Sequence, residues 1–334
     1  MQRRYCYVSG IRLGVPALEE LCARGRPPAL VISYTAEYAD SSGFNHFEDL
    51  ARAHDLPHVR ACDTNSEEVR QALTTHAIDL MVVAGWSQQV HEQALADLPL
   101  GGVGLHPTPL PVGRGHAPIP WTILRGMSAS AVTLHHLASE VGAGDIVDQI
   151  WFDLPDDVTA TGLYERISHL QSELLVRHID DLLAGTAPRS PQSGHVSVWP
   201  PRRPSDGCLD LTASGTDVDR MVRALADPYP GAFAMFGGAR ITLCSGELTD
   251  ALGGAPGEIV SAGPGRTWGV TCGDGRVFVP DVVRVDEGVR ADPASLAMFR
   301  PGEFFDEPSP HMVAATRHAH VPGQAENLDA LLRA

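Results

Sequence analysis

The N-terminal part of the chain alternates short apolar runs with segments of helical periodicity. The apolar runs have the length and β-branched content of strands: Arg4–Ser9, Ala29–Tyr34, His58–Arg60, Ile78–Ala84 and Ala131–Leu137. Apolar residues recur at helical spacing between and after these runs: Val15–Ala23, Phe47–His54, Ser66–Thr75 and Leu163–Ala184. This alternation is typical of βαβ units and predicts an α/β fold with a doubly wound, mostly parallel sheet.

A different pattern begins after a segment rich in Pro, Ser and Gly. One helix is predicted at Asp217–Ala226. Short β-like runs separated by Gly and Pro follow it: Ala232–Phe236, Arg240–Cys244, Glu258–Val260, Trp268–Thr271 and Val277–Val282. Such runs predict a small β-barrel-like domain. We therefore divide the chain into an α/β domain (1–190), a linker (191–204), a β-rich accessory domain (205–290) and a C-terminal tail (291–334).

The composition is that of an acidic globular protein. Hydrophobic residues make up 43% of the chain and charged residues 20%, and 41 acidic against 25 basic residues give a formal net charge of -16. Such a charge repels the phosphates of nucleic acids. Residues 204–290 alone hold 12 acidic and 7 basic residues, so the accessory domain has the wrong sign for a tRNA surface.

Cysteine usage and apolar run lengths indicate the compartment. The six cysteines are scattered without a CxxC pair, which argues against a disulfide scaffold or a structural zinc site. No apolar stretch of the signal-peptide kind follows the basic N-terminus. No segment approaches the ~20 apolar residues that a membrane span needs. We expect a cytoplasmic protein that does not insert into membranes.

A Pro- and Gly-dense stretch, Gly101–Pro120, follows the most apolar of the predicted strands. It is too polar and too punctuated for the core, and α/β proteins place their sites on such loops. Pro107, Pro109 and Pro111 stiffen the backbone after His106, because each proline fixes its own φ. Histidine suits proton transfer near neutral pH, which makes His106 a candidate catalytic residue. The alternative is that it only forms a hydrogen bond within a turn.

The stretch from His106 to Trp121, HPTPLPVGRGHAPIPW, closely resembles the histidine loop of folate-dependent formyltransferases. Further segments resemble the same family in the same order, including its accessory domain in methionyl-tRNA and sugar-amine formyltransferases: Asp79–Ser87, Gly144–Val147, Arg202–Gly207, Val222–Phe233 and Pro256–Val260. The resemblance covers about residues 5–285. It implies transfer of a formyl group from 10-formyltetrahydrofolate to an amine.

The resemblance also implies where the folate binds. Its pocket would be formed by the turn Gly85–Val90 and the segment Ala138–Gly142, largely through backbone groups. The implied folate-binding residues are Gly85, Trp86, Ser87, Gln88, Gln89, Val90, Leu110, Arg114, Gly115, Val141 and Gly142. Arg114 would clamp an anionic group such as the folate glutamate, or else it caps a surface loop. Trp86 is otherwise a packing residue.

Two positions depart from the family pattern. The family uses an asparagine and a histidine to stabilise the oxyanion and move protons, and an aspartate to orient water and take up a proton. The asparagine position is Gly104 here, and the aspartate position is Gly142. Asp145 is the nearest substitute for the missing carboxylate, and Glu140 is the next. His106 and Asp145 are therefore the expected catalytic residues, unless Asp145 only binds backbone N–H groups in its loop.

Other histidines give weaker signals. His135 and His136 are adjacent on a predicted strand, so their side chains point to opposite faces. One of them could approach the site, or both are structural. The histidines have no HxxxH or HxH spacing, and we therefore expect no metal site.

Three functions remain open from the sequence. The first is a small-molecule N-formyltransferase whose acceptor is a nucleotide-linked amino sugar or an amino acid derivative, with tRNA disfavoured by charge. The second is a divergent enzyme on the same scaffold, for example a formyl-folate hydrolase, which Gly104 and Gly142 would permit. The third is a folate-binding protein without catalysis. Fold analogy alone does not separate them, and a homodimer is compatible with each.

Overall fold

The chain forms two units. The computed structural model describes residues 3–38, 42–262, 268–286, 288, 290–293, 296 and 298–308, so most of the predicted tail lies outside the described residues. The first unit consists of Met1–Pro118, Ala129–Leu154 and Gly162–Pro200. The second unit consists of Ile119–Ser128, Pro155–Thr161 and Pro201–Ala334.

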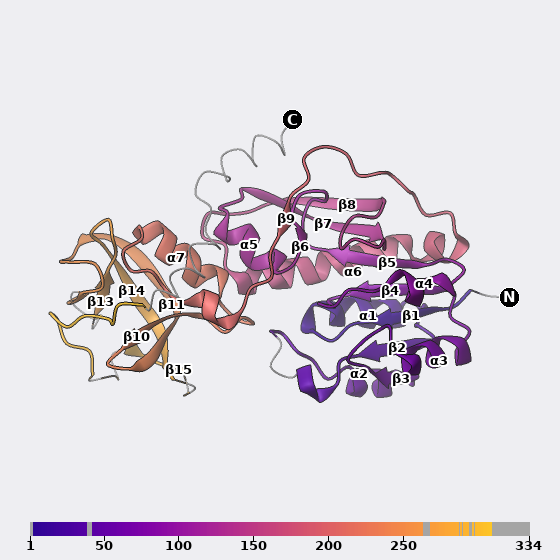
Figure 1. The fold of residues 1–334 in the computed structure, drawn as a ribbon, viewed down its shortest axis with the longest axis horizontal. Coiled ribbons are helices and arrows are strands. Elements are labelled where there is room, and N and C mark those ends of the chain that lie inside the picture. The colour runs from indigo at the N-terminus through magenta and orange to yellow at the C-terminus, as the bar shows by residue number, and fades with distance from the viewer. Residues whose placement is uncertain are drawn as a thin grey trace. The chain divides into compact units, whose positions relative to one another are not determined.

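The first unit is built on a seven-stranded sheet of order β3-β2-β1-β4-β5-β7-β8 (Figure 1). Its strands are β1 (Tyr5–Val8), β2 (Leu30–Ser33), β3 (His58–Arg60), β4 (Leu80–Ala84), β5 (Gly102–His106), β7 (Ala129–His136) and β8 (Ile146–Asp153). The pairings among β1 to β5 are parallel, whereas β7 runs antiparallel to both β5 and β8. The predicted α/β fold with a mostly parallel sheet is confirmed.

Helices cover both faces of this sheet, as expected for doubly wound topology. The helices of the first unit are α1 (Val15–Ala23), α2 (Phe47–Ala53), α3 (Glu67–Thr75), α4 (Glu92–Ala96) and α6 (Ala160–Ala184). On one face, Val69 and Leu73 of α3 join a buried cluster with Met81 and Val83 of β4. On the other face, Ser168 of α6 donates a 2.9 Å hydrogen bond to the carbonyl next to α1. Among the described residues, no helix is long and apolar enough to span a membrane.

Most predicted elements of the first unit match the structure within a few residues. The helix Val15–Ala23 has the predicted bounds, and Ser66 caps α3 by accepting a hydrogen bond from the Val69 N–H. The strand Gly102–His106 was expected to be loop, and that expectation is wrong: all of it is buried. Two glycines in five residues are typical of a turn when the segment is considered alone. In the strand, neighbouring side chains occupy the space beside these glycines: Leu137 Cδ1 would lie 2.8 Å from a Cβ on Gly102.

A second correction concerns the end of the same stretch. The segment Pro118–Leu124 forms the short helix α5, although its prolines were read as loop signals. Pro118 and Pro120 both lie in the first turn, where a missing N–H costs no helical hydrogen bond. The position of a proline relative to the helix start, rather than its presence, decides whether it breaks the helix.

In its described residues the second unit holds a six-stranded antiparallel sheet and the ten-residue helix α7 (Gly215–Ala224). The antiparallel half-barrel confirms the predicted β-barrel-like C-terminal domain. Its elements are α7 (Gly215–Ala224), β10 (Ala232–Phe236), β11 (Ala239–Leu252), β12 (Ile259–Val260), β13 (Gly269–Thr271), β14 (Arg276–Val285) and β15 (Arg290–Ala291). Strand β11 is much longer than the predicted run Arg240–Cys244. None of the residues in its second half is buried, and the register shifts after Leu243, so apolar patterning detected only the buried part of the strand.

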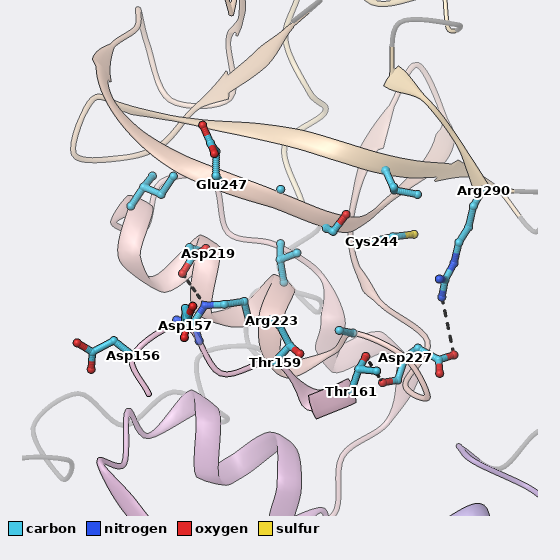
Figure 2. A pocket seen from close by; sticks show the side chains of 16 residues that line it. Asp156, Asp157, Thr159, Thr161, Asp219, Arg223, Asp227, Cys244, Glu247 and Arg290 are labelled. Atoms are coloured by element: carbon cyan, nitrogen blue, oxygen red, sulfur yellow. Dashed lines mark hydrogen bonds and ion pairs between the residues drawn. The ribbon is translucent and has the colours of Figure 1, made fainter. Parts of the chain in front are cut away.

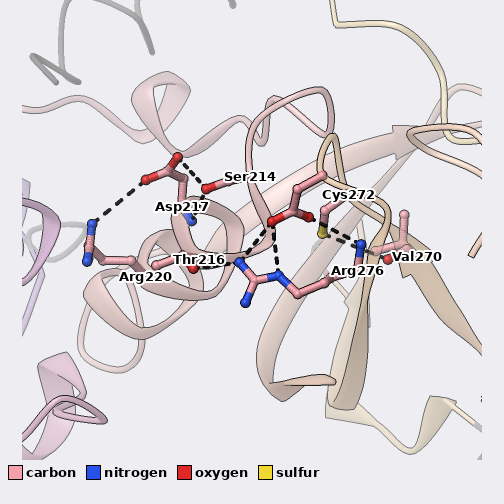
Figure 3. A network of polar contacts seen from close by, with 8 residues as sticks. Ser214, Thr216, Asp217, Arg220, Val270, Cys272 and Arg276 are labelled. Carbon is pink, nitrogen blue, oxygen red and sulfur yellow. Dashed lines mark hydrogen bonds and ion pairs between the residues drawn. The ribbon is translucent and has the colours of Figure 1, made fainter. Parts of the chain in front are cut away.

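A polar network ties the start of α7 to β14 (Figure 3). The Ser214 side chain accepts a hydrogen bond from the Asp217 N–H and so caps the helix. Arg276 of β14 donates a 2.7 Å hydrogen bond to the Thr216 hydroxyl and pairs with Asp274 at 2.8 Å. The network fixes the helix against the sheet at one end.

The second unit should lose stability when its core is truncated. Phe278 of β14 is fully buried, whereas Leu252 at the end of β11 is 79% exposed. We expect Phe278→Ala to lower the free energy of unfolding by about 3–5 kcal/mol. The matched control Leu252→Ala should change it by less than about 0.5 kcal/mol. Urea unfolding checks both, and equal effects would contradict the assignment of this core.

Candidate active site

His106 is the last residue of β5 and is buried rather than exposed on a loop. Its side chain is 9% exposed, and its Nε2–H donates a 2.7 Å hydrogen bond to the Gly113 carbonyl. The Thr108 hydroxyl donates to the same carbonyl at 3.3 Å. The proline-containing loop therefore folds back over His106 and fixes its ring. The sequence located the residue, but its expected exposure was wrong.

A row of polar side chains crosses the sheet beside His106. The strand register pairs His106 with Thr133 and Thr133 with Gln149, so all three lie on one face. Gln149 donates hydrogen bonds to the Thr133 hydroxyl at 2.8 Å and to the Leu110 carbonyl at 3.0 Å. Neither Thr133 nor Gln149 was predicted as a site residue. Thr133 lies two residues before His135 on one strand, so both point to the same face, but only the pairing of β5, β7 and β8 shows that this is the face of His106 and Gln149.

His135 lies on the His106 face, and His136 on the opposite one. Gly104, two residues before His106, is the direct cross-strand partner of His135. The His136 Nε2 instead lies 3.1 Å from the Pro188 carbonyl. The alternatives left open for this pair are therefore decided by the register of β5 with β7.

Burial keeps the two histidines on this face neutral. Desolvation lowers the pKa of His106 to about 4, and desolvation likewise lowers the pKa of His135 to about 4. The positive charge that His106 would carry further disfavours protonation of His135, and that of His116 disfavours protonation of His106. Near pH 7 both rings are therefore proton acceptors rather than cations.

The two loops that the resemblance assigns to folate are joined in the structure. The turn Gly85–Val90 directly follows β4, and the Gln89 side chain donates a 2.6 Å hydrogen bond to the Ser139 carbonyl in the segment Ala138–Gly142. The Ser87 N–H donates to the Tyr34 hydroxyl at 2.7 Å, and Gln88 donates to Tyr38.

Trp86 both packs and presents an unused donor. Its ring stacks on Tyr34 with centroids 3.9 Å apart and an interplanar angle of 16°, and it borders the buried cluster of this face. Its Nε1–H is buried, and none of the described residues accepts a hydrogen bond from it. A buried N–H without an acceptor is costly, so a ligand carbonyl or ring nitrogen would be favoured there.

Arg114 is held by a neighbouring amide. Its Nε and Nη2 donate to the Gln192 Oε1 at 3.1 and 2.7 Å, and Gln192 donates in turn to the carbonyls of Gly142 and Gly144 at 2.7 Å each. Gly115 pairs with Trp199 in the two-stranded ribbon β6 (Arg114–Gly115) and β9 (Val198–Trp199). The contacts of Gln192 anchor the loop that contains Gly142 and Gly144.

The remaining predicted site residues differ in their surroundings. Leu110 is buried, and Val141 is 39% exposed. Gly142 has φ +72, a backbone conformation that favours glycine, and a Cβ there would lie 3.3 Å from Arg114 Cγ. An aspartate restored at this position would therefore be strained. Asp145 is half-buried, and its charge acts on His136; among the described contacts none joins it to His106.

A separate cavity of about 630 Å³ lies within the second unit (Figure 2). Acidic residues outnumber basic ones in its lining: Asp156, Asp157, Asp219, Asp227 and Glu247 against Arg223 and Arg290. Arg223 is already paired with Asp219 at 2.8 Å. It contains none of the predicted site residues. Among the described residues, no group of three or more His, Cys, Asp or Glu side chains is arranged to hold a metal ion.

Comparison with known proteins defines the class. Residues 20–179 match the Formyl transferase family, and residues 202–298 match the family described as Formyl transferase, C-terminal domain. The chain belongs to the formyl transferase family. This confirms the resemblance drawn from the histidine loop.

Solved structures share the fold at low sequence identity. An N-formyltransferase from Helicobacter canadensis, solved with folinic acid and dTDP-3-aminofucose, has a TM-score of 0.62 at 16% identity over 83% of this chain and 98% of that one. A methionyl-tRNA formyltransferase from Clostridium thermocellum has a TM-score of 0.55 at 16% identity, over 75% and 95% of the two chains. HypX from Aquifex aeolicus, solved with tetrahydrofolic acid, has a TM-score of 0.63 at 16% identity over 92% of this chain. The chain spans about half the length of HypX, 51%.

The buried histidines predict acid sensitivity. Both have a folded-state pKa of about 4 against the usual 6.5, so the unfolded chain binds more protons between these values. The free energy of unfolding should therefore fall as the pH drops from about 6.5 to about 4. Unfolding titrations at several pH values measure this slope. His106→Gln and His135→Gln should each remove about one proton from this slope. A slope that neither substitution changes would contradict the lowered pKa of the two histidines.

Proposed function

We propose that the chain transfers a formyl group from 10-formyltetrahydrofolate to the amine of a small molecule. The observation that carries this is the position of His106: it ends a buried central strand, and its ring is fixed by the Gly113 carbonyl. The paired loops around Gln89 and Ser139 and the unused Trp86 N–H support folate binding next to the same sheet face. Three of the similar solved structures hold folate derivatives.

The acceptor we propose is a nucleotide-linked amino sugar or an amino acid derivative. The Helicobacter canadensis structure binds dTDP-3-aminofucose and is similar to this chain over 83% of its length. The net charge of -16 opposes a tRNA acceptor, because a polyanion would have to approach an acidic protein. A small-molecule acceptor does not need a basic surface on the protein.

Two residues are proposed to carry proton and charge movements. His106 would move protons while the amine attacks the formyl carbon, because its Nε2–H is held by the Gly113 carbonyl and its Nδ1 carries the lone pair of the neutral ring. Amines are largely protonated at neutral pH, so one proton must leave before attack. Asp145 is proposed to take up that proton through an ordered water, in place of the aspartate that Gly142 replaces.

The glycines favour one alternative, a divergent enzyme such as a formyl-folate hydrolase. Gly104 and Gly142 remove two polar side chains, and loss of one oxyanion donor alone costs on the order of 10²–10³ in rate. Incubation with 10-formyltetrahydrofolate, with and without candidate amines, separates the possibilities. Amine-dependent release of tetrahydrofolate supports the transferase, release without amine supports the hydrolase, and binding without turnover leaves only a folate-binding protein.

His106→Ala should abolish turnover while the protein stays folded. Without the imidazole, kcat should fall by about 10²-fold or more. The free energy of unfolding should fall by only about 1 kcal/mol, because Thr108 still donates to the Gly113 carbonyl. A reduced folate at ~100 times its Kd should still stabilise the variant by ~2.7 kcal/mol, measured by thermal unfolding. Unchanged turnover would overturn the role of His106.

Asp145→Asn should lower kcat much more than it changes KM, because a proton-transfer role acts in the transition state. Glu140→Gln, in the same loop, is the matched control and should leave both constants unchanged. Steady-state kinetics with a fixed acceptor measures this. If Glu140→Gln slows the reaction and Asp145→Asn does not, the carboxylate role belongs to Glu140.

A further inference from the structure

The space beside Gly104 is bordered by an imidazole and a leucine side chain. A Cβ built on Gly104 would lie 3.2 Å from the His135 Nε2 and 2.9 Å from Cδ2 of Leu137. The two residues are direct partners in the antiparallel pairing of β5 with β7, on the face that carries His106. His135 therefore covers the region in which a side chain at position 104 would begin.

One tautomer of His135 follows from its hydrogen bond. The ring Nδ1 lies 2.8 Å from the His136 carbonyl oxygen, so Nδ1–H donates and the neutral ring carries its lone pair on Nε2. That nitrogen is the ring atom nearest to the Cβ position of Gly104. Among the hydrogen bonds of the described residues, none involves this atom. The Nε2 of His135 can therefore accept a proton or a hydrogen bond from a ligand.

The groups around His135 keep its ring neutral. Besides burial, His106, His136 and Arg114 all oppose a positive charge on the ring, and burial is the largest cause of the lowered pKa. His106 cannot easily provide the same acceptor, because its Nε2–H is committed to the Gly113 carbonyl and only its Nδ1 remains. His106 therefore presents its Nδ1 and His135 its Nε2 on the same face of the sheet.

We propose that His135 is a catalytic residue of the formyl transfer and that Gly104 is the residue that makes room for it. This rests on the proposed function. As the amine nitrogen bonds to the formyl carbon, the amine loses its second proton, which the His135 Nε2 accepts. When the bond between the formyl carbon and the folate N10 breaks, this proton passes to N10, so His135 ends the cycle neutral.

A double-mutant cycle on Gly104 and His135 tests this in the full chain. His135→Ala should lower kcat by about 10²-fold, with the Kd for a reduced folate within about twofold of wild type. Gly104→Asn should lower both kcat and the melting temperature, because its Cβ crowds the imidazole and Leu137. Adding His135→Ala to Gly104→Asn should recover part of the melting temperature, because it removes the crowded imidazole, and kcat should stay as low as in His135→Ala alone, because the proton acceptor is missing in both. His58→Ala, on the edge strand β3 of the same sheet, is the matched control and should leave kcat unchanged.

The outcomes separate the two proposals. If His135→Ala lowers kcat by less than about threefold, His135 is not a catalytic residue, but the proposed formyl transfer still holds. A wild-type chain without amine-dependent release of tetrahydrofolate would overturn both. Additive losses of melting temperature in the cycle would show that Gly104 and His135 do not share space, which also overturns the inference.

Discussion

The antiparallel pairing of β7 with β5 is the constraint on which the site depends. It sets Gly104 opposite His135 and His106 opposite Thr133, so that chemistry-bearing side chains from separate strands share one face. A shift of one residue would turn each of these side chains to the other face. Successive residues of both strands are buried, so such a shift would also move polar side chains into the packing of the other face, and the core therefore holds the register.

Burial gives that face its chemistry. His106 and His135 lie where charge is disfavoured, so both rings remain neutral at a pH at which a solvent-exposed histidine is partly protonated. Hydrogen bonds to the carbonyls of Gly113 and His136 then fix which ring nitrogen carries the lone pair. The site is preorganised by backbone carbonyls, and these do not depend on side-chain identity nearby.

The two glycines that distinguish this chain from the family pattern have different structural meanings. A side chain at position 104 would be crowded, since its Cβ would lie 2.9 Å from Leu137 Cδ2 and 3.2 Å from the His135 Nε2. Gly142 is a backbone requirement, since its φ of +72 suits glycine, and Gln192 binds its carbonyl. Replacing Gly104 with asparagine would therefore crowd its neighbours, and replacing Gly142 with aspartate would strain the backbone.

The sequence by itself determined the fold class, the family and the position of His106. Apolar periodicity is a local property, and the histidine loop is a contiguous motif, so both can be read from neighbouring residues. Only the tertiary structure decided that Gly102–His106 is a buried strand, that His135 rather than His136 faces the site, and that Gln149 joins it. These facts depend on strand pairing between residues far apart in the chain, which no local pattern encodes.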